Sequence, residues 1–306
     1  MMLQMYQVKR ISRSEFVPVR NLQYHVRVWG EATPSQPPLV LVHGWMDVAA
    51  SYQFVVDAFA SDRYVIAPDW RGYGDTDSGA VDNYWFPDYL ADLDFLLDHY
   101  APGQAVDLVG HSMGGNVAML YAGVRPARIR RLVNLEGFGM PVTQATQAPR
   151  RYAKWLDELK KLHAGELDLK AYPAVSGVAR RLMKTNPRLD QLKADWLAQH
   201  WARANAAGQW EIRGNPAHKI TNAQLYRVDE VLEIYKCISA PTLSVEASDN
   251  SLDQWWKGKY TLAEYHERLK VVPQVEIRKI ENAGHMMHHD QPEILAALIE
   301  QFLAVD

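Results

Sequence analysis

The sequence predicts an α/β protein built on a parallel sheet, because short apolar runs alternate with segments of helical pattern. The apolar runs lie at residues 39–42, 64–67, 105–109, 131–135 and 242–245. Such short continuous runs are typical of strands buried on both faces. Apolar residues at helical spacing separate several of them, at 52–60 and 85–100. Strands that alternate with helices favour a parallel sheet.

The remaining segments complete this pattern and divide the chain. Residues 15–19 and 22–29 alternate in polarity around Arg20-Asn21, which predicts a hairpin, while 275–280 and 292–303 predict a last strand and a last helix. Between residues 137 and 236 no clear buried strand occurs, and helical patterns dominate at 152–162, 175–183 and 189–206. We therefore expect a core domain of residues 1–136 and 237–306, with a helical cap domain of residues 137–236 inserted between two strands.

Composition excludes several classes of function. The chain has 306 residues, of which 48% are hydrophobic and 23% charged, and its net charge is −3. This balance is ordinary for a globular protein and predicts no nucleic-acid partner. Residues 1–10 lack the apolar centre of a signal peptide, and no run approaches the roughly 20 apolar residues of a membrane span. With the single cysteine, Cys237, these features predict a cytoplasmic enzyme without a disulfide.

The most informative motif is Gly110-His111-Ser112-Met113-Gly114. An apolar run precedes it and a helix-forming run, 116–122, follows. A sharp turn from strand to helix exposes the serine side chain, and small residues two positions before and after it let strand and helix pass closely. Ser112 is therefore the candidate nucleophile, with the start of a helix behind it to favour developing negative charge.

Together with three other segments, this motif resembles the α/β-hydrolase fold superfamily. The other segments are His43-Gly44-Trp45, the glycine loop at 69–74, and Ala283-Gly284-His285 before the last helix. The resemblance covers nearly the whole chain. It implies an eight-stranded, mostly parallel sheet with helices on both faces and a cap over the active site.

The resemblance also implies roles for individual residues. His285 would be the base that activates Ser112, and the backbone N–H groups of Trp45 and Met113 would form the oxyanion hole. His288 and His289, close behind His285, are as readily explained as residues of the final helix. We expect the substrate pocket to be lined by four residues, namely Trp45, His111, Phe138 and Trp255.

The acid that would orient His285 has two candidates. The family usually places an aspartate after the seventh strand, and here Asn250 falls in that register with Asp249 one position earlier. Glu136, at the tip of the sixth strand, is the alternative, because residues 136–141 are similar in layout to one group of haloalkane dehalogenases. Either carboxylate would fix the imidazole tautomer. The sequence slightly favours Asp249.

A serine nucleophile indicates a carbonyl substrate. The leading prediction is a carboxylic-ester hydrolase for small to medium hydrophobic esters, acting through an acyl-enzyme on Ser112. Alternatives are hydrolysis of a carbon–carbon bond in a ring-cleavage product, hydrolysis of a lactone or thioester, and a ligand-binding relative without catalysis. No cofactor is expected, and no metal, because apart from His285, His288 and His289 no group has ligand spacing.

Overall fold

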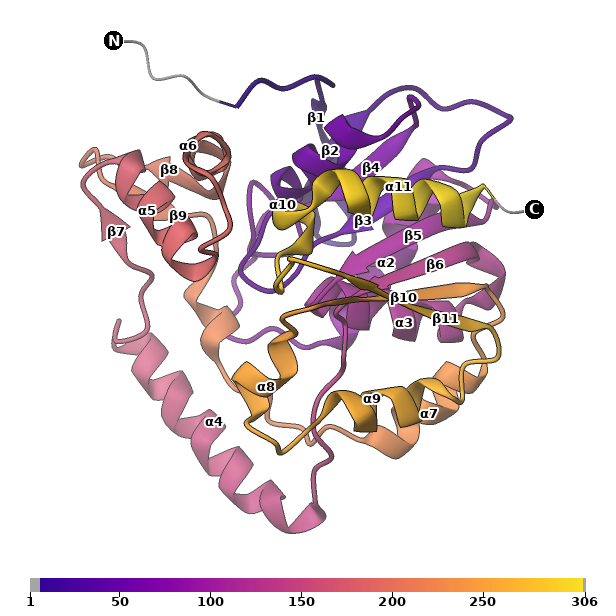
Figure 1. Ribbon diagram of the computed structural model, residues 1–306. Coiled ribbons are helices and arrows are strands. Elements are labelled where there is room, and N and C mark those ends of the chain that lie inside the picture. Colours follow the sequence, from indigo (N-terminus) through magenta and orange to yellow (C-terminus); the bar gives the residue numbers. More distant parts are fainter. Residues whose placement is uncertain (1–5, 305–306) are drawn as a thin grey trace.

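The computed structural model describes residues 6–304, and its central feature is one eight-stranded sheet (Figure 1). The strand order is β1-β2-β4-β3-β5-β6-β10-β11. Strand β2 runs antiparallel to β1 and β4, and every neighbouring pair from β4 to β11 is parallel. The strands are β1 (Arg13–Val19), β2 (Leu22–Trp29), β3 (Leu39–Val42), β4 (Val65–Pro68), β5 (Val106–His111), β6 (Ile129–Leu135), β10 (Thr242–Ala247) and β11 (Val275–Ile280). The predicted fold class is confirmed.

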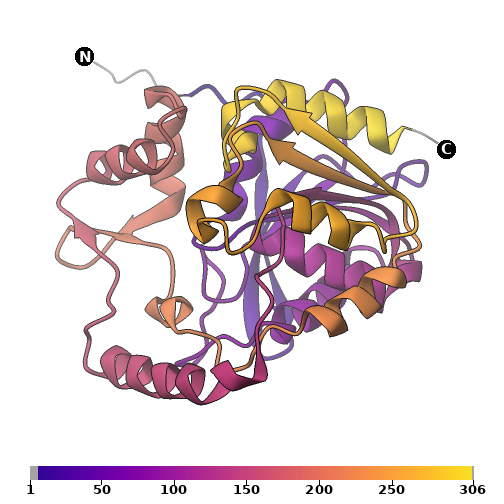
Figure 2. The same cartoon turned by 60° about the horizontal axis from the view of Figure 1, so that its bottom comes forward.

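Helices cover both faces of this sheet (Figures 1 and 2). Helices α1 and α11 pack on one face, and α2, α3, α7 and α9 pack on the other. Short elements η1, η2, α8 and α10 lie in the connections. Their bounds are α1 (Gln53–Ala58), α2 (Pro87–Tyr100), α3 (Met113–Val124), α7 (Val228–Lys236), α8 (Ser251–Trp256), α9 (Leu262–Leu269), α10 (Met287–Asp290), α11 (Pro292–Leu303), η1 (Ala49–Tyr52) and η2 (Pro126–Arg128). The sequence did not predict α8 or α9.

Strand β3 shows how the sequence builds two cores at once. Leu39 and Leu41 join the cluster under α1 and α11, whereas Val40 and Val42 join the cluster under α2 and α3. This alternation follows from the two-residue period of a strand. All four side chains are buried, and each such burial contributes roughly 1.5–3 kcal/mol relative to exposure. The continuous apolar run is therefore required by a sheet that is covered on both faces.

The segment between β6 and β10 contains more than helices. Its helices are accompanied by a small antiparallel sheet with the order β7-β9-β8. The elements are η3 (Ala145–Gln147), α4 (Ala148–His163), β7 (Ala171–Tyr172), α5 (Val175–Thr185), α6 (Gln191–Trp201), β8 (Ala202–Ala204), β9 (Trp210–Ile212) and η4 (Pro216–Lys219). The expectation of an all-helical segment is therefore wrong. Strands of two or three residues are too short to show a period.

The helices between β6 and β10 differ in how they pack against the rest of the molecule. Helices α5 and α6 share an apolar cluster with Val48, Ala50 and Phe54. Helix α4 has no buried residue and extends away from the sheet (Figure 1). Helix α7 packs on α3 although its residues were assigned to the cap. The division into core and cap at 137–236 stays a prediction, and α7 packs with the core.

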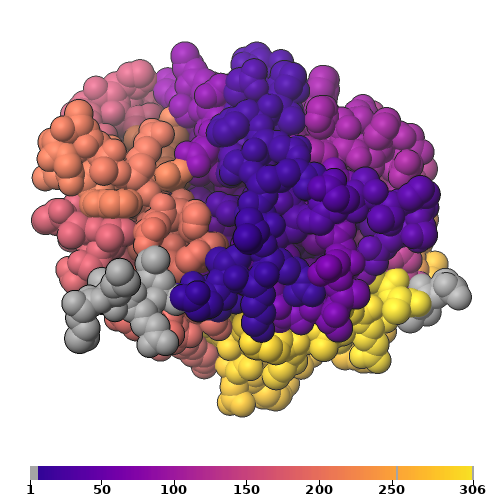
Figure 3. Space-filling view, turned by 90° about the horizontal axis from the view of Figure 1, so that it is seen from above, coloured from indigo at the N-terminus to yellow at the C-terminus, as the bar shows by residue number. Residues whose placement is uncertain are grey.

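The amino-terminal strands also meet the inserted segment. Viewed from above, orange atoms of that segment lie against the indigo surface of the amino-terminal residues (Figure 3). One contact between them joins an Arg27 guanidinium nitrogen to Nδ1 of His200 at 3.2 Å. Within residues 6–304 no helix combines the length and the apolar character that crossing a membrane requires. The cellular location stays a prediction.

A close helix contact away from the strand ends gives a test of the packing. A Cβ on Gly123 of α3 would lie 2.2 Å from the carbonyl oxygen of Ile234 in α7. Gly123→Ala should therefore lower the free energy of unfolding by about 1–3 kcal/mol, because overpacking outweighs the roughly 1 kcal/mol gain in helix propensity. Urea unfolding measures the change. Val124→Ala, at an exposed position of the same helix, should stay within about 0.5 kcal/mol of wild type. A stabilised Gly123→Ala variant would contradict this packing.

Candidate functional site

Ser112 occupies a strained turn between β5 and α3. Its φ of 53° and ψ of −115° are rare for a residue with a side chain. Two glycines make this turn possible. A Cβ on Gly110 would lie 2.3 Å from the Gly114 carbonyl oxygen, and one on Gly114 would lie 2.2 Å from the Val42 carbonyl oxygen. The turn therefore has the geometry predicted from the motif, with the half-buried Ser112 at the carboxyl end of the sheet.

The loop after β3 passes beside this turn. A Cβ on Gly44 would lie 3.1 Å from the Cβ of Ser112, so only glycine allows so close an approach. His43 fixes the loop, because its Nε2 accepts the backbone N–H of Trp70 and its Nδ1 donates to the Gly44 carbonyl. Burial lowers the pKa of His43, which keeps its ring neutral for this pattern. Trp45, which follows Gly44, and Met113, the first residue of α3, thus both adjoin Ser112.

His285 lies in the loop between β11 and α10, and a buried carboxylate holds its ring. Nδ1 of His285 donates to Oε2 of Glu136 at 2.7 Å. The Glu136 side chain is inaccessible to solvent, whereas 19% of the His285 side chain is exposed. The opposite edge of the imidazole is therefore the one open to a reaction partner.

His111 connects His285 to the turn that carries Ser112. Its ring centroid lies 4.6 Å from that of His285, and its Nε2 donates to the His285 backbone carbonyl at 2.7 Å. Because Ser112 directly follows His111, the candidate nucleophile and the candidate base lie at the same edge of the sheet.

Glu136 is held by three hydrogen bonds. In addition to His285, the Ala247 amide donates to Oε1 at 3.0 Å and the Ser251 hydroxyl donates to Oε2 at 3.0 Å. The φ of Glu136 is 51°, which places it in the left-handed region directly after β6. A buried carboxylate requires such partners, because an unpaired charge in the interior is costly.

The structure places Asp249, the acid that the sequence slightly favours, away from His285. Its side chain is 71% exposed and its carboxylate lies 3.4 Å from the Arg188 guanidinium of the inserted segment. The turn after β10 directs Asp249 outward, while Glu136, at the end of the neighbouring strand, reaches the imidazole of His285. The signal in the sequence that favoured Glu136 was its position directly after the strand at 131–135.

The four residues expected in the substrate pocket are placed unequally. Trp45 and Trp255 are exposed to 54% and 48%, and the Trp255 ring meets the His285 ring edge-on at 4.4 Å. His111 and Phe138 are only 2% and 4% exposed. Side chains so deeply buried present little surface to a substrate, and the pocket role of His111 and Phe138 stays a prediction. Trp45 and Trp255 remain candidates for the rim.

The sequence did not predict that the inserted segment contacts the loops that follow β3 and β4. His218, in η4, stacks between the rings of Tyr73 and Tyr84, with centroid distances of 3.8 and 3.7 Å. Its carbonyl accepts the indole N–H of Trp45 at 3.1 Å. Burial lowers the pKa of His218 to about 3, so the ring is neutral at physiological pH. No local pattern around His218 indicated this contact.

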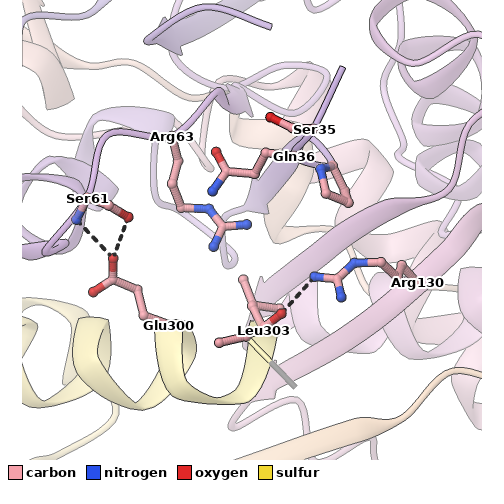
Figure 4. A pocket seen from close by; sticks show the side chains of 9 residues that line it. Ser35, Gln36, Ser61, Arg63, Arg130, Glu300 and Leu303 are labelled. Atoms are coloured by element: carbon pink, nitrogen blue, oxygen red, sulfur yellow. Dashed lines mark hydrogen bonds between the residues drawn. The ribbon is translucent and has the colours of Figure 1, made fainter. Parts of the chain in front are cut away.

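A pocket of about 490 Å³ lies at the other end of the strands (Figure 4). Arg130, near the start of β6, faces it, and so does Glu300 of α11. Its lining consists of Ser35, Gln36, Pro37, Ser61, Arg63, Arg130, Glu300, Leu303 and Ala304. Because Ser112 and His285 lie at the carboxyl ends of the strands, this pocket is not the place of their chemistry.

Among the residues that the structure describes, two groups of side chains have the composition of a metal site. Asp47, His111 and His288 form one, and His25, Asp69 and Asp75 form the other. In the second group both ring nitrogens of His25 are already bonded, to Asp69 at 2.7 Å and to Ser14 at 2.9 Å. That group is therefore satisfied by its own contacts.

Comparison with known proteins agrees with this architecture. Residues 37–292 match the family model of the alpha/beta hydrolase fold. The chain belongs to the α/β hydrolase fold family. This α/β hydrolase is 26% identical to a serine hydrolase-like protein of Danio rerio over 303 residues, which cover 96% of the chain and 89% of that protein.

The chain is also similar to a second curated protein and to a solved structure. A cis-3-alkyl-4-alkyloxetan-2-one decarboxylase of Shewanella oneidensis is 26% identical to the α/β hydrolase over 275 residues, or 87% of the chain and 81% of that protein. The solved thioesterase domain from the curacin biosynthetic pathway is similar with a TM-score of 0.80 and 24% identity, over 95% of this chain and 99% of that one. The last comparison shows the fold alone. The relatives differ in reaction, so they support a hydrolase family without fixing the substrate.

The two candidate acids can be separated by matched substitutions that remove only the charge. Glu136→Gln should lower kcat for p-nitrophenyl acetate by about 10³–10⁴-fold, because the amide lacks the negative charge and can turn its NH2 donor toward Nδ1, which favours the wrong imidazole tautomer. Asp249→Asn should change kcat less than about 3-fold, because its carboxylate contacts solvent and Arg188. Steady-state kinetics on both variants, with unfolding midpoints as a control for folding, measure the difference. A large loss in Asp249→Asn with a mild one in Glu136→Gln would contradict the assignment.

Proposed function

We propose that this α/β hydrolase is a serine hydrolase that cleaves small to medium hydrophobic carboxylic esters through an acyl-enzyme. The observation that carries the proposal is the placement of Ser112 on its strained turn, at the same edge of the sheet as an imidazole whose Nδ1 is bonded to a buried carboxylate. In this proposal Ser112 is the nucleophile, His285 the general base and acid, and Glu136 the residue that orients His285.

The tautomer of His285 follows from its partner. An ionised carboxylate only accepts hydrogen bonds, so the proton of the neutral ring sits on Nδ1 and the lone pair on Nε2. Nε2 then takes the hydroxyl proton of Ser112 as Oγ attacks the carbonyl carbon of the ester. The imidazolium that forms lies against the Glu136 carboxylate and is stabilised by it. It returns the proton to the leaving alkoxide, and water repeats the sequence on the acyl-enzyme.

The negative oxygen of the tetrahedral intermediate needs preorganised donors. In the proposal these are the backbone N–H groups of Trp45 and Met113, which adjoin Ser112 from two different elements. The amino terminus of α3 adds a favourable dipole, because Met113 is its first residue. Backbone donors held by a turn and a helix cost little reorganisation during the reaction.

The nucleophile narrows the reaction class within the family. Epoxide hydrolases are also among the relatives, as the Caenorhabditis elegans enzyme that is 22% identical over 301 residues shows. Family members that open epoxides attack with an aspartate, whereas the corresponding position here is Ser112. A serine alkoxide favours acyl transfer from a carbonyl compound. The exposed rings of Trp45 and Trp255 suit a hydrophobic ester rather than a charged one.

We also propose that the inserted segment covers the site as a lid. His218 of this segment contacts Trp45, and Arg188 contacts Asp249. Trp45 follows β3 and Asp249 follows β10, so the two contacts lie on either side of the strand ends that carry the proposed site. Helix α4 has no buried residue, and Tyr152 and Leu156 on it are about half exposed. Apolar side chains left exposed on the inserted segment are consistent with a surface that closes over a hydrophobic substrate.

Hydrolysis of a p-nitrophenyl ester series, from acetate to palmitate, tests the proposal. Wild type should hydrolyse the shorter esters, and Ser112→Ala should lose at least about 10³-fold in kcat, because no other group replaces the nucleophile. Ser176→Ala, the same change at an exposed position of α5, should behave like wild type. Undiminished turnover by Ser112→Ala would contradict the proposal. A folded wild type inactive on every ester would favour carbon–carbon bond hydrolysis or a role without catalysis.

A further inference from the structure

Behind Ser112 lies a cluster of buried ionisable side chains that the proposed reaction does not use. It consists of Asp47 from the loop after β3, His111 at the end of β5 and His288 in α10. All three are at most 3% exposed. One carboxylate oxygen of Asp47 and one ring nitrogen of each histidine lie within 4.8 Å of one another. Three elements distant in sequence thus bring their polar atoms to one point.

Asp47 has one oxygen engaged and one free. Its Oδ1 accepts the Ser51 hydroxyl and, at 2.9 Å, the indole N–H of Trp201 in the inserted segment. Its Oδ2 has no hydrogen-bond partner and lies 3.6 Å from Nε2 of His288. The carboxylate is therefore oriented by two donors, while the second oxygen is directed into the cluster.

His111 also has one nitrogen engaged and one free. Because Nε2 contacts a carbonyl oxygen, that of His285, it must carry the ring proton. Nδ1 is then a bare lone pair, and it is buried without a partner. Burial keeps the pKa of His111 well below its ordinary value, so the lone pair is available at neutral pH.

His288 completes the cluster, since neither of its ring nitrogens has a hydrogen-bond partner. A buried polar atom without a hydrogen-bond partner costs free energy. Asp47, His111 and His288 each contribute at least one such atom, and Asp47 Oδ2 and His288 Nε2 face each other at 3.6 Å. The cost is removed if one ligand satisfies them together.

We infer that Asp47, His111 and His288 form a binding site for one divalent transition-metal ion of the zinc class. Two imidazoles and one carboxylate are ligands that zinc prefers, and three protein ligands leave a fourth position for water. The second coordination sphere is also present. A metal-bound histidine usually donates its other N–H to a carbonyl or carboxylate, as His111 does to the His285 carbonyl. This assignment departs from the expectation of no metal, because the ligands are far apart in sequence.

A metal ion bound at this site would affect the proposed active site, because His111 contacts both. Ligands at about 2.0–2.2 Å from zinc lie roughly 3.4 Å from one another, which is close to the 3.6 Å between Asp47 Oδ2 and His288 Nε2. An ion bound to Nδ1 would fix the ring of His111, which precedes Ser112 and holds the backbone of His285. The ion therefore inhibits the hydrolase reversibly. This consequence rests on the proposed function, whereas the binding itself does not.

Metal content tests the binding. Chelator-treated protein is incubated with zinc chloride, freed of unbound ion by desalting, and analysed for zinc per chain. Wild type should retain about one equivalent, and both His288→Gln and Asp47→Asn should lose it. His163→Gln, which removes an exposed histidine, and His285→Ala, which removes the active-site imidazole but keeps its carbonyl, should retain it. A wild type without zinc, or equal zinc in His288→Gln, would overturn the inference.

A crystal structure of the zinc-loaded wild type tests the site without any substitution, and so does not depend on whether the variants fold. An anomalous peak at the zinc edge should lie between Asp47, His111 and His288. A peak only at His285, or only water in the cluster, would overturn it. Zinc should also lower p-nitrophenyl acetate turnover of wild type at least about 10-fold, reversibly with chelator, and leave His288→Gln insensitive. If wild type binds zinc but hydrolyses no ester, the proposed function fails and the metal site stands.

Discussion

The buried carboxylate of Glu136 holds together the edge of the sheet at which Ser112 and His285 lie. Its partners come from the end of β10, from α8 and from the loop after β11, so a single side chain ties these elements to β6. Removing a carboxylate from water is costly, and a carboxylate without solvent contact is stable only while its donors stay in place. The same contacts that satisfy Glu136 therefore position the imidazole of His285.

Backbone strain at the same edge is supported in a similar way. Ser112 and Glu136, at the ends of neighbouring strands, both have positive φ. The Ser112 amide donates to the Leu135 carbonyl at 2.8 Å, which ties Ser112 to the peptide group just before Glu136. Next to them, the Asn134 side chain accepts from the Gly137 amide and donates to its carbonyl. Strained conformations persist where surrounding contacts over-determine them, and at such places they favour preorganised chemistry.

Much of this architecture follows from local sequence patterns, and the failures have physical causes. The run at 39–42 and the helix at 292–303 were predicted within a residue, because burial on two faces and amphipathic spacing are local properties. The strained turn at Ser112 was predictable because it needs glycines at fixed positions. The choice between Asp249 and Glu136 was not, since it depends on which neighbouring strand end reaches His285.

The burial of His111 was equally hidden from the sequence. Its neighbours His285 and His288 lie more than 170 residues away along the chain, so no local spacing reveals the contact. The short strands β7 to β9 were not predicted for a different reason: two or three residues are too few to show the alternation of apolar and polar side chains that marks a strand. Tertiary contacts decide both features.

The hydrogen bond between His285 and Glu136 is the central claim, and proton NMR tests it most directly. With histidine labelled by nitrogen-15, the Nδ1 proton of His285 should resonate far downfield in wild type and in Asp249→Asn, because a buried carboxylate accepts it. That resonance should be lost in Glu136→Gln. A downfield proton that persists without the Glu136 carboxylate, or that disappears when Asp249 is changed, would contradict the account.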